Sequence, residues 1–111
     1  MYSLIVKGKF DAAHHLPGYP GDCARTHGHT WLVEVKVSGE TLQPNMFLVD
    51  FKEIKDIWKK YDHQNLNEFF EFPTAENISQ TIWKELHSIP FIDVGYVEVW
   101  ESPDASVRYS E

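Results

Sequence analysis

Two stretches near the beginning of the chain alternate between hydrophobic and polar positions. From Leu4 to His14 one phase is apolar up to its last residue, and from His27 to Val37 one phase carries two histidines, a tryptophan and three valines. Because successive side chains of a strand point to opposite faces of a sheet, this period is typical of half-buried β-strands. A loop rich in Pro and Gly separates the two stretches, so we expect an antiparallel pair of strands.

The middle of the chain changes to the helical period. Apolar residues three or four positions apart predict a first helix that begins near Asp50, which forms a plausible capping pair with Glu53. The polar run "DHQNLNEFFEFP" breaks this pattern. A second helix is expected to begin with Thr74 as its N-cap and to end before Pro90.

The last part of the chain predicts two short strands, 94–101 and 105–109, joined by a Ser-Pro-Asp turn. The element order is then ββααββ, without an internal repeat. This order predicts an α+β fold: a single domain, residues 1–111, with a four-stranded antiparallel sheet and two helices on one face. Such a sheet has two open edges, which copies of the same chain often cover.

Size and composition narrow the class of protein. A chain of 111 residues suffices for one hydrophobic core, and 42% hydrophobic residues argue against long disordered segments. The net charge of −7 argues against a general nucleic-acid partner, because duplex binding needs a basic face. No stretch resembles a signal peptide or a membrane span, so we expect a cytoplasmic location and no membrane partner.

Three histidines fall on the core-facing phases of the two predicted strands. His27 and His29 project together, with Gly28 between them keeping the backbone uncrowded, and antiparallel pairing would bring His14 near them. A single histidine on an apolar face is more often a hydrogen-bonded core residue, but three together favour a metal site. Three imidazoles and one vacant position are typical of catalytic zinc. His15 lies on the other phase and is expected at the surface or facing substrate.

The only cysteine, Cys23, lies in the loop, four residues before His27. A lone thiol is usually a small buried hydrophobe, but a divalent metal and Arg25 nearby would favour a thiolate that acts as base or nucleophile. Asp62 and His63 are adjacent in a polar loop, where the carboxylate can orient the imidazole. Such a pair is usually a turn feature when it stands alone. Together with Cys23 and a metal it is a candidate proton-transfer set.

Glu101 ends the third predicted strand on the phase of Val97 and Val99, so its side chain either points inward or lies at the rim. Exposed glutamates at strand ends are common. The functional interpretation is a carboxylate that accepts two hydrogen bonds from an amidine-like edge of a ligand.

Six short motifs extend these observations to nearly the whole chain. The segments "FDAAHHLP", "CARTHGH", "VDF", "DHQNLN", "PTAEN" and "VWES" resemble, in order and approximate spacing, the 6-pyruvoyl-tetrahydropterin synthase superfamily. The resemblance is greatest to the 6-carboxy-5,6,7,8-tetrahydropterin synthase branch of queuosine (7-deazapurine) biosynthesis, because three residues separate Cys23 from His27. The pyruvoyl-forming enzymes typically have a longer gap.

The resemblance implies a tunnelling fold (T-fold) that assembles as a homohexamer, a dimer of trimers with active sites at subunit interfaces. It also implies a role for each motif residue. These are zinc (Zn²⁺) ligands at His14, His27 and His29, catalytic residues Cys23, Asp62 and His63, and substrate-binding residues Glu101, Thr74, Glu76 and Arg25.

The implied reaction converts 7,8-dihydroneopterin triphosphate and water to 6-carboxytetrahydropterin, acetaldehyde and triphosphate. Two other functions stay open. One is a 6-pyruvoyl-tetrahydropterin synthase, which eliminates phosphate and keeps the side-chain carbons. The other is a zinc-stabilised binding module in which Cys23 completes the metal site and no substrate is converted.

Overall fold

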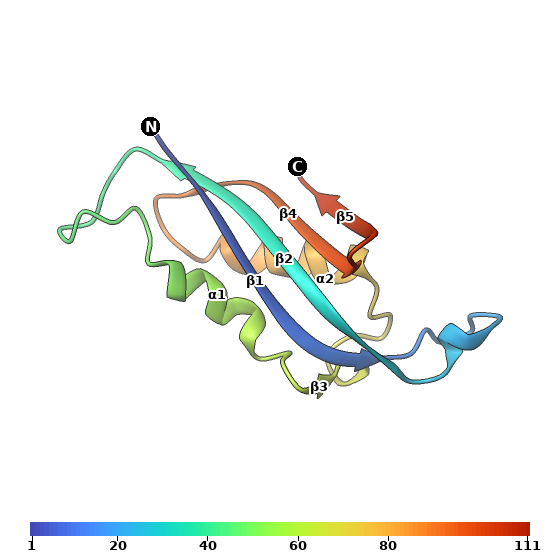
Figure 1. The fold of residues 1–111 in the computed structure, drawn as a ribbon. Coiled ribbons are helices and arrows are strands. Elements are labelled where there is room, and N and C mark those ends of the chain that lie inside the picture. Colours follow the sequence, from blue (N-terminus) through green and yellow to red (C-terminus); the bar gives the residue numbers. More distant parts are fainter.

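The computed structural model describes residues 1–111, in which two long strands cross the whole molecule (Figure 1). The strands are β1 (Tyr2–His14), β2 (His27–Gly39), β3 (Gln64–Asn65), β4 (Asp93–Ser102) and β5 (Ala105–Tyr109), in the spatial order β3-β1-β2-β4-β5. The helices are α1 (Phe51–Lys59) and α2 (Ala75–Leu86), with short 3₁₀ helices at Asp22–Ala24 and Leu66–Glu68.

The long strands have the pairing that their alternation predicts. β1 and β2 are antiparallel in continuous register from Tyr2 opposite Gly39 to His14 opposite His27. β4 pairs antiparallel with β2, and β5 pairs antiparallel with β4. The α+β class and the two helices on one face are therefore confirmed.

The predicted strand count of four is wrong, and the sheet is mixed instead of wholly antiparallel. β3 adds a fifth strand, which pairs parallel with β1 at Ala12 and Ala13. Two residues are too few to show a period in the sequence. A tertiary hydrogen bond places β3 instead, because the His63 amide donates to the Asp11 carbonyl at 2.6 Å, immediately before the strand begins.

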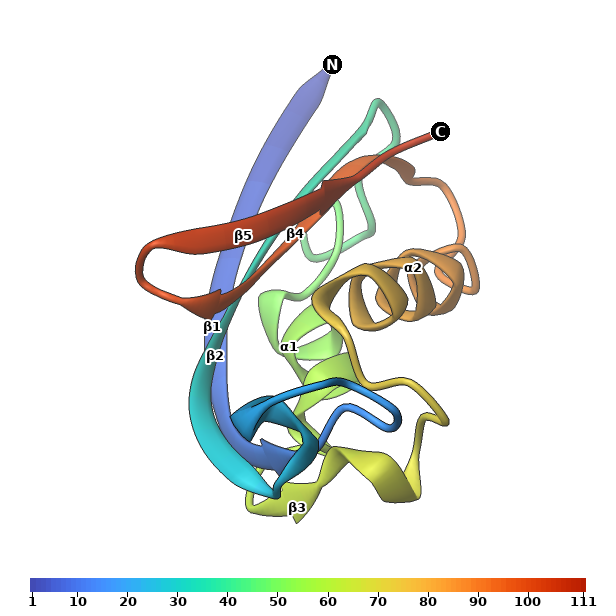
Figure 2. The same cartoon turned by 90° about the vertical axis from the view of Figure 1, so that its right-hand side faces the viewer.

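The core lies between the sheet and the two helices, which cover the same face (Figure 2). Side chains of both layers are fully buried there. They include Val33, Val35 and Val37 of β2 and Ile54, Ile78, Ile82 and Leu86 of the helices. α1 approaches β1 so closely that a Cβ atom on Gly8 would lie 2.7 Å from the Trp58 indole nitrogen. A glycine at this position therefore permits the contact between helix and sheet.

Side-chain caps begin both helices where the sequence predicts them. The Asp50 carboxylate accepts a hydrogen bond from the Lys52 amide (2.9 Å), and the Thr74 hydroxyl accepts one from the Asn77 amide (3.2 Å). Because Thr74 fixes the beginning of α2, it also fixes the chain just before the helix, which contacts the end of β1.

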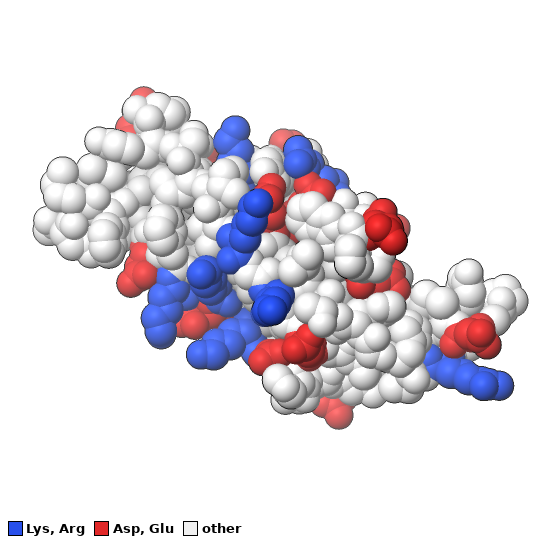
Figure 3. All heavy atoms as spheres, viewed as in Figure 1, with Lys and Arg blue, Asp and Glu red and all other residues white.

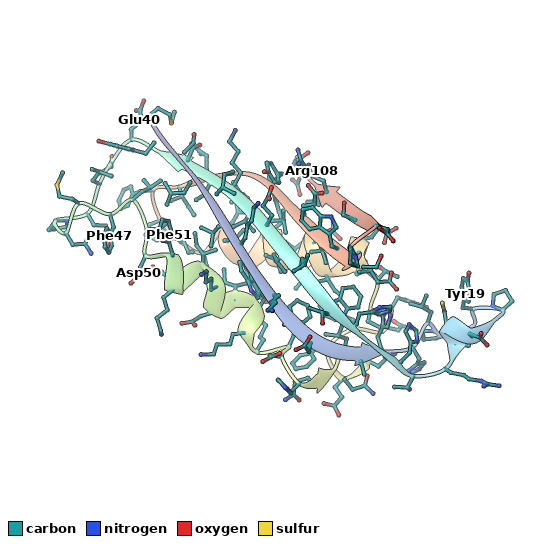
Figure 4. All side chains as sticks on the ribbon, in the orientation of Figure 1. Tyr19, Glu40, Phe47, Asp50, Phe51 and Arg108 are labelled. Carbon is teal, nitrogen blue, oxygen red and sulfur yellow. The ribbon has the colours of Figure 1, made fainter.

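The molecule is elongated, with extents of 51 × 25 × 23 Å, because β1 and β2 extend beyond the helices. Loop 15–26 lies at one end and loop 40–50 at the other (Figure 1). In Figure 4, Tyr19 marks the first end, and Phe47 and Phe51 mark the second. None of the helices is long and apolar enough to cross a membrane.

Candidate metal centre and active site

Three imidazoles converge on the inner face of the sheet at the end that carries loop 15–26. His14 ends β1, and His27 and His29 begin β2, so the register that places His14 opposite His27 brings the rings together. The ring centroids lie 4.6 Å apart for His14 and His27, 5.1 Å for His14 and His29, and 4.8 Å for His27 and His29. Alternation along two paired strands is sufficient to build this cluster.

Backbone carbonyls determine which ring nitrogens face the centre of the cluster. His14 Nδ1 lies 2.8 Å from the Pro73 carbonyl oxygen, and His27 Nδ1 lies 2.7 Å from the Arg25 carbonyl oxygen. A carbonyl only accepts hydrogen bonds, so each Nδ1 must carry the proton. In the neutral rings, the Nε2 atoms of His14 and His27 are then free to accept a cation, in the way that metal-binding histidines are commonly oriented.

The nitrogens that face the centre lack the partners that buried polar atoms normally have. His14 is completely buried, and the Nε2 atoms of His14 and His29 are both buried without a hydrogen-bond partner. A buried acceptor without a partner costs roughly 1–3 kcal/mol. A divalent cation bound by all three nitrogens would remove this cost, so the residues present fit a zinc ion.

The protonation of His29 favours metal binding. Burial lowers the pKa of the His29 imidazole, the nearby His14 and His27 lower it further, and only the Glu101 carboxylate opposes this change. The ring is therefore neutral over a wider pH range than an exposed histidine, and the neutral ring is the form that binds metal.

Glu101 joins the cluster from β4. Its Oε1 atom lies 3.1 Å from His29 Nε2 and 3.5 Å from His14 Nε2. The register between β4 and β5 shifts between Trp100 and Ser102, so Glu101 occupies a β-bulge, a feature that redirects a side chain next to many active sites. The sequence placed Glu101 on the inner phase or at the rim, and the structure places its carboxylate among the histidines.

Cys23 does not belong to the cluster. It lies half-buried in the 3₁₀ helix of loop 15–26, and its carbonyl accepts a hydrogen bond from the Leu16 amide (2.8 Å). The group of potential ligand atoms that lie within 4.8 Å of one another contains the three histidines and Glu101, without the Cys23 sulfur. The Glu101 carboxylate therefore lies beside the three histidines, where the hypothesis of a zinc-stabilised binding module expected the Cys23 thiol.

Asp62 and His63 form an exposed pair at the β3 edge of the sheet. His63 Nδ1 lies 3.0 Å from Asp62 Oδ2, and His63 adopts a positive φ of 60°. The Asp11 amide donates a hydrogen bond to Asp62 Oδ1 (2.9 Å), and this bond is the main reason that the pKa of Asp62 lies below its ordinary value. His63 and His29 border the same open depression. In one chain the pair is nevertheless a group separate from the metal cluster.

The other predicted site residues lie at the beginning of α2 and in loop 15–26. Thr74 is half-buried as the cap of α2, Glu76 is exposed in the first turn of that helix, and Arg25 is exposed in the loop and forms no ion pair within the chain. His15 is half-buried, and Asn67 holds it, because the His15 amide donates to Asn67 Oδ1 (2.9 Å) and Asn67 Nδ2 donates to the His15 carbonyl (3.1 Å).

Two contributors to the site have no signal in the sequence. The carbonyls of Pro73 and Arg25 orient His14 and His27, but a backbone oxygen is present at every residue and marks none. The role expected for Gly28 is also wrong for a single chain. A Cβ atom at Gly28 would meet no atom within 4 Å, so packing within the chain does not require glycine there.

A mixed five-stranded sheet, backed by two helices and carrying three inward histidines at one end, defines an α+β protein with a candidate metal site. Comparison with known proteins identifies its family. The chain belongs to the 6-pyruvoyl tetrahydropterin synthase family, whose sequence model matches residues 3–111.

Several relatives are similar over most of the chain. A putative 6-carboxy-5,6,7,8-tetrahydropterin synthase from Archaeoglobus fulgidus is 38% identical over 103 residues, which cover 89% of this chain and 87% of that protein. A 6-carboxy-5,6,7,8-tetrahydropterin synthase from Haemophilus influenzae is 28% identical over the full length of both proteins. A dihydroneopterin monophosphate aldolase from Pyrococcus furiosus is 31% identical, covering 95% of this chain and 94% of that protein.

Solved structures agree on the fold. The 6-pyruvoyl tetrahydropterin synthase of Caenorhabditis elegans superimposes with a TM-score of 0.78 at 25% identity, covering 99% of this chain and 95% of that one. The Plasmodium vivax 6-pyruvoyl tetrahydropterin synthase superimposes with a TM-score of 0.67 at 21% identity, covering 97% and 96% of the two chains. At 21% identity, the second comparison supports the fold alone.

Proposed function

We propose that this protein is a zinc-dependent 6-carboxy-5,6,7,8-tetrahydropterin synthase, a lyase that converts 7,8-dihydroneopterin triphosphate to 6-carboxytetrahydropterin, acetaldehyde and triphosphate. The observation that carries the proposal is the convergence of three histidines, two of them with a buried Nε2 that has no hydrogen-bond partner, in a chain whose relatives include proteins named for this activity. The spacing of three residues between Cys23 and His27 favours the same branch.

His14, His27 and His29 would hold the zinc. When bound, zinc would supply Lewis acidity toward the hydroxyl groups of the substrate side chain. The carbonyls of Pro73 and Arg25 keep two of the rings in the tautomer and orientation required. Because the main chain supplies these partners, the site is organised before any ligand arrives.

Cys23 is the proposed base that removes a carbon-bound proton from the substrate side chain. Its loop is closed at the base by the hydrogen bond from the Leu16 amide to the Cys23 carbonyl, and the exposed guanidinium of Arg25 lies two residues away. The thiolate is the form of a cysteine that accepts a proton. The half-buried position leaves the thiol open to substrate.

His63, oriented by Asp62, is the proposed proton relay. The carboxylate lies 3.0 Å from His63 Nδ1, which leaves Nε2 to exchange protons with a substrate. The side chain of His63 is 79% exposed at an open sheet edge, so in an oligomer it is available to the metal site of a neighbouring copy. We therefore expect Cys23 and the Asp62–His63 pair to meet across a subunit interface.

The remaining predicted residues would hold the substrate. Glu101, Thr74 and Glu76 are the candidates for the pterin ring, and Arg25 is the candidate for the triphosphate. Lys and Arg side chains gather over the middle of the exposed sheet face (Figure 3). Among the basic residues of the strands, Lys7 is paired with Glu34 and Arg108 with Glu98. Arg25 has no such partner and is free to bind an anion.

A homohexamer is the proposed assembly. Both edges of the sheet offer unpaired backbone, since β3 covers only Ala12 and Ala13 of β1, and no strand pairs with the outer side of β5. The end opposite the metal site is apolar and exposed, with Met46 71%, Phe47 52% and Phe51 55% accessible. Burial of these surfaces between copies would be favourable. Size-exclusion chromatography with light scattering measures the mass of the assembly in solution. A monomer at the assay concentration would contradict the hexamer.

Product identification tests the proposed reaction. The zinc-loaded protein is incubated with 7,8-dihydroneopterin triphosphate, and the pterin and the volatile aldehyde are identified by mass spectrometry. Acetaldehyde with 6-carboxytetrahydropterin supports the proposal. A pyruvoyl pterin that keeps its side-chain carbons would identify a 6-pyruvoyl-tetrahydropterin synthase instead.

A second candidate is a dihydroneopterin monophosphate aldolase, favoured by the Pyrococcus furiosus relative, which matches over 95% of the chain. The same assay with dihydroneopterin monophosphate separates the two activities, because retro-aldol cleavage of that side chain releases a phosphorylated two-carbon aldehyde. Turnover of the monophosphate with none of the triphosphate would favour the aldolase.

A Cys23→Ala variant separates catalysis from metal binding. Because the thiol is outside the ligand cluster, we expect this variant to lose turnover and to keep its full zinc content, measured by atomic emission. Loss of zinc from Cys23→Ala would instead support the binding module in which sulfur completes the metal site.

A further inference from the structure

We propose that Glu101 is an exchangeable fourth ligand of the metal: it closes the centre in the absence of substrate and leaves when substrate binds. This inference concerns the metal site of the proposed function and rests on it. The sequence predicts three histidine ligands and a vacant fourth position. In the structure the Glu101 carboxylate lies next to the three histidines, where a fourth ligand would be.

The distances between the potential ligand atoms fit a shared metal. Around a tetrahedral zinc with bonds of roughly 2.0–2.1 Å, neighbouring ligand atoms lie about 3.3 Å apart. The Oε1 atom of Glu101 lies 3.1 Å from His29 Nε2 and 3.5 Å from His14 Nε2, one value on each side of the tetrahedral edge. The carboxylate therefore has the spacing of a ligand to a cation that it shares with the histidines.

The atoms of His14 and Glu101 that face each other both offer lone pairs. His14 donates its Nδ1 proton to the Pro73 carbonyl, so in the neutral ring its Nε2 offers a lone pair toward Glu101. A carboxylate also offers only lone pairs. The Nε2 atoms of His14 and His29 have no hydrogen-bond partner despite the nearby oxygen. For His14, whose Nδ1 carries the proton, Nε2 and the carboxylate oxygen 3.5 Å away are both acceptors, which repel one another unless a cation lies between them. A shared metal explains this contact.

Glu101 can leave the cluster, whereas His14 cannot. The Glu101 side chain is 37% exposed, while that of His14 is completely buried. Glu101 lies at the β-bulge between Trp100 and Ser102, next to the turn that joins β4 and β5. A rotation about its side-chain bonds would move the carboxylate into solvent or toward a bound ring without disturbing the core.

Closure by a carboxylate has a chemical consequence. With a metal bound, the Glu101 carboxylate would complete its coordination in the free enzyme, and a fourth position would open only for a ligand that can replace the carboxylate. A polyol side chain with two adjacent hydroxyl groups has that ability, because it offers two oxygens at once. The released Glu101 is then free to accept hydrogen bonds from the ring of the same molecule.

The test compares metal affinity and coordination in Glu101→Gln and Glu101→Ala with the wild-type protein. Asp104→Asn is the control, because it removes an exposed carboxylate of the β4–β5 turn that lies outside the ligand cluster. Zinc affinity is measured by competition with a chromophoric chelator. We expect Glu101→Ala to bind zinc at least about tenfold more weakly than wild type, and Asp104→Asn to bind it equally well. Circular dichroism confirms that each variant is folded.

Cobalt in place of zinc reports the coordination directly. The visible bands of the cobalt-loaded protein are expected to differ between wild type and Glu101→Ala, and addition of neopterin to wild type should change them as well. Equal zinc affinity and identical cobalt spectra in wild type and Glu101→Ala overturn the inference. Zinc affinity and cobalt spectra do not depend on which product the enzyme forms. Unchanged affinity and spectra would therefore leave the proposed reaction untouched. A product other than 6-carboxytetrahydropterin would leave the role of Glu101 as a metal ligand untouched.

Discussion

Zinc should stabilise this protein in a manner that depends on His14. The three ligands lie at the adjoining ends of β1 and β2, and the Pro73 carbonyl links His14 to the beginning of α2. The native fold therefore presents a complete site, while the unfolded chain separates His14 from His27 by twelve residues of loop. A ligand that binds only the native state raises the free energy of unfolding by RT ln(1 + [L]/Kd).

The rise in Tm that zinc should cause can be calculated from the length of the chain. Free zinc at a hundred times its dissociation constant adds about 2.7 kcal/mol. With an unfolding entropy of about 2.1 cal/mol/K per residue, the entropy for 111 residues is about 0.23 kcal/mol/K. The expected rise in Tm is therefore about 12 °C.

The assay is a thermal melt by circular dichroism, with and without zinc, at one fixed protein concentration. His14→Ala should lose most of the rise. Its Tm without zinc will also change, because His14 is completely buried, so the comparison is the zinc-induced shift and not the absolute Tm. The control is His87→Ala, which removes an exposed histidine at the end of α2. An equal zinc-induced shift in His14→Ala and wild type would refute the assignment of His14 as a ligand.

Three further predictions use other parts of the chain. Gly8→Ala should lower the free energy of unfolding by about 1–3 kcal/mol in urea melts, because its Cβ would lie 2.7 Å from the Trp58 ring; an unchanged midpoint would contradict the packing described. Burial raises the pKa of Tyr61 to about 12, so the stability that the neutral phenol contributes is complete below pH about 10 and is lost as the pH rises through about 12. Absorbance titration should therefore show a tyrosine that ionises near pH 12 and that is missing in Tyr61→Phe. Asp62→Asn should lower kcat by about 10²-fold or more while zinc affinity stays unchanged, because it removes the partner of His63 from outside the metal cluster; full activity would show that the pair has no role in proton transfer.

The parts of the site that the sequence predicts are those set by strand alternation. A period of two, continued over β1 and β2, determines which side chains face the helices, and antiparallel pairing determines which ends meet. His14, His27 and His29 follow from these two rules alone. The same rules place Glu101 on the inner phase with Val97 and Val99.

Other features depend on tertiary contacts that leave no pattern. The direction of Cys23 is set by the fold of an irregular loop, where side chains have no period. β3 is two residues long and exists because the His63 amide reaches the Asp11 carbonyl. The Glu101 side chain points toward the histidines because of the β-bulge after Trp100. None of the residue types at this position predicts a bulge.

The sequence alone also leaves open whether an inward histidine is a core residue or a ligand, and the structure answers this through the second nitrogen of the ring. A histidine that serves only packing satisfies both nitrogens or leaves one in water, as His87 does: its Nδ1 contacts the Trp83 carbonyl (2.8 Å) and its side chain is exposed. His14 has the same kind of Nδ1 contact, but its Nε2 is buried without a partner and faces other lone pairs. A fold maintains such a costly arrangement when a bound cation removes the cost. The distinction therefore lies in what each buried nitrogen faces, which becomes visible only when β1, β2 and β4 are assembled.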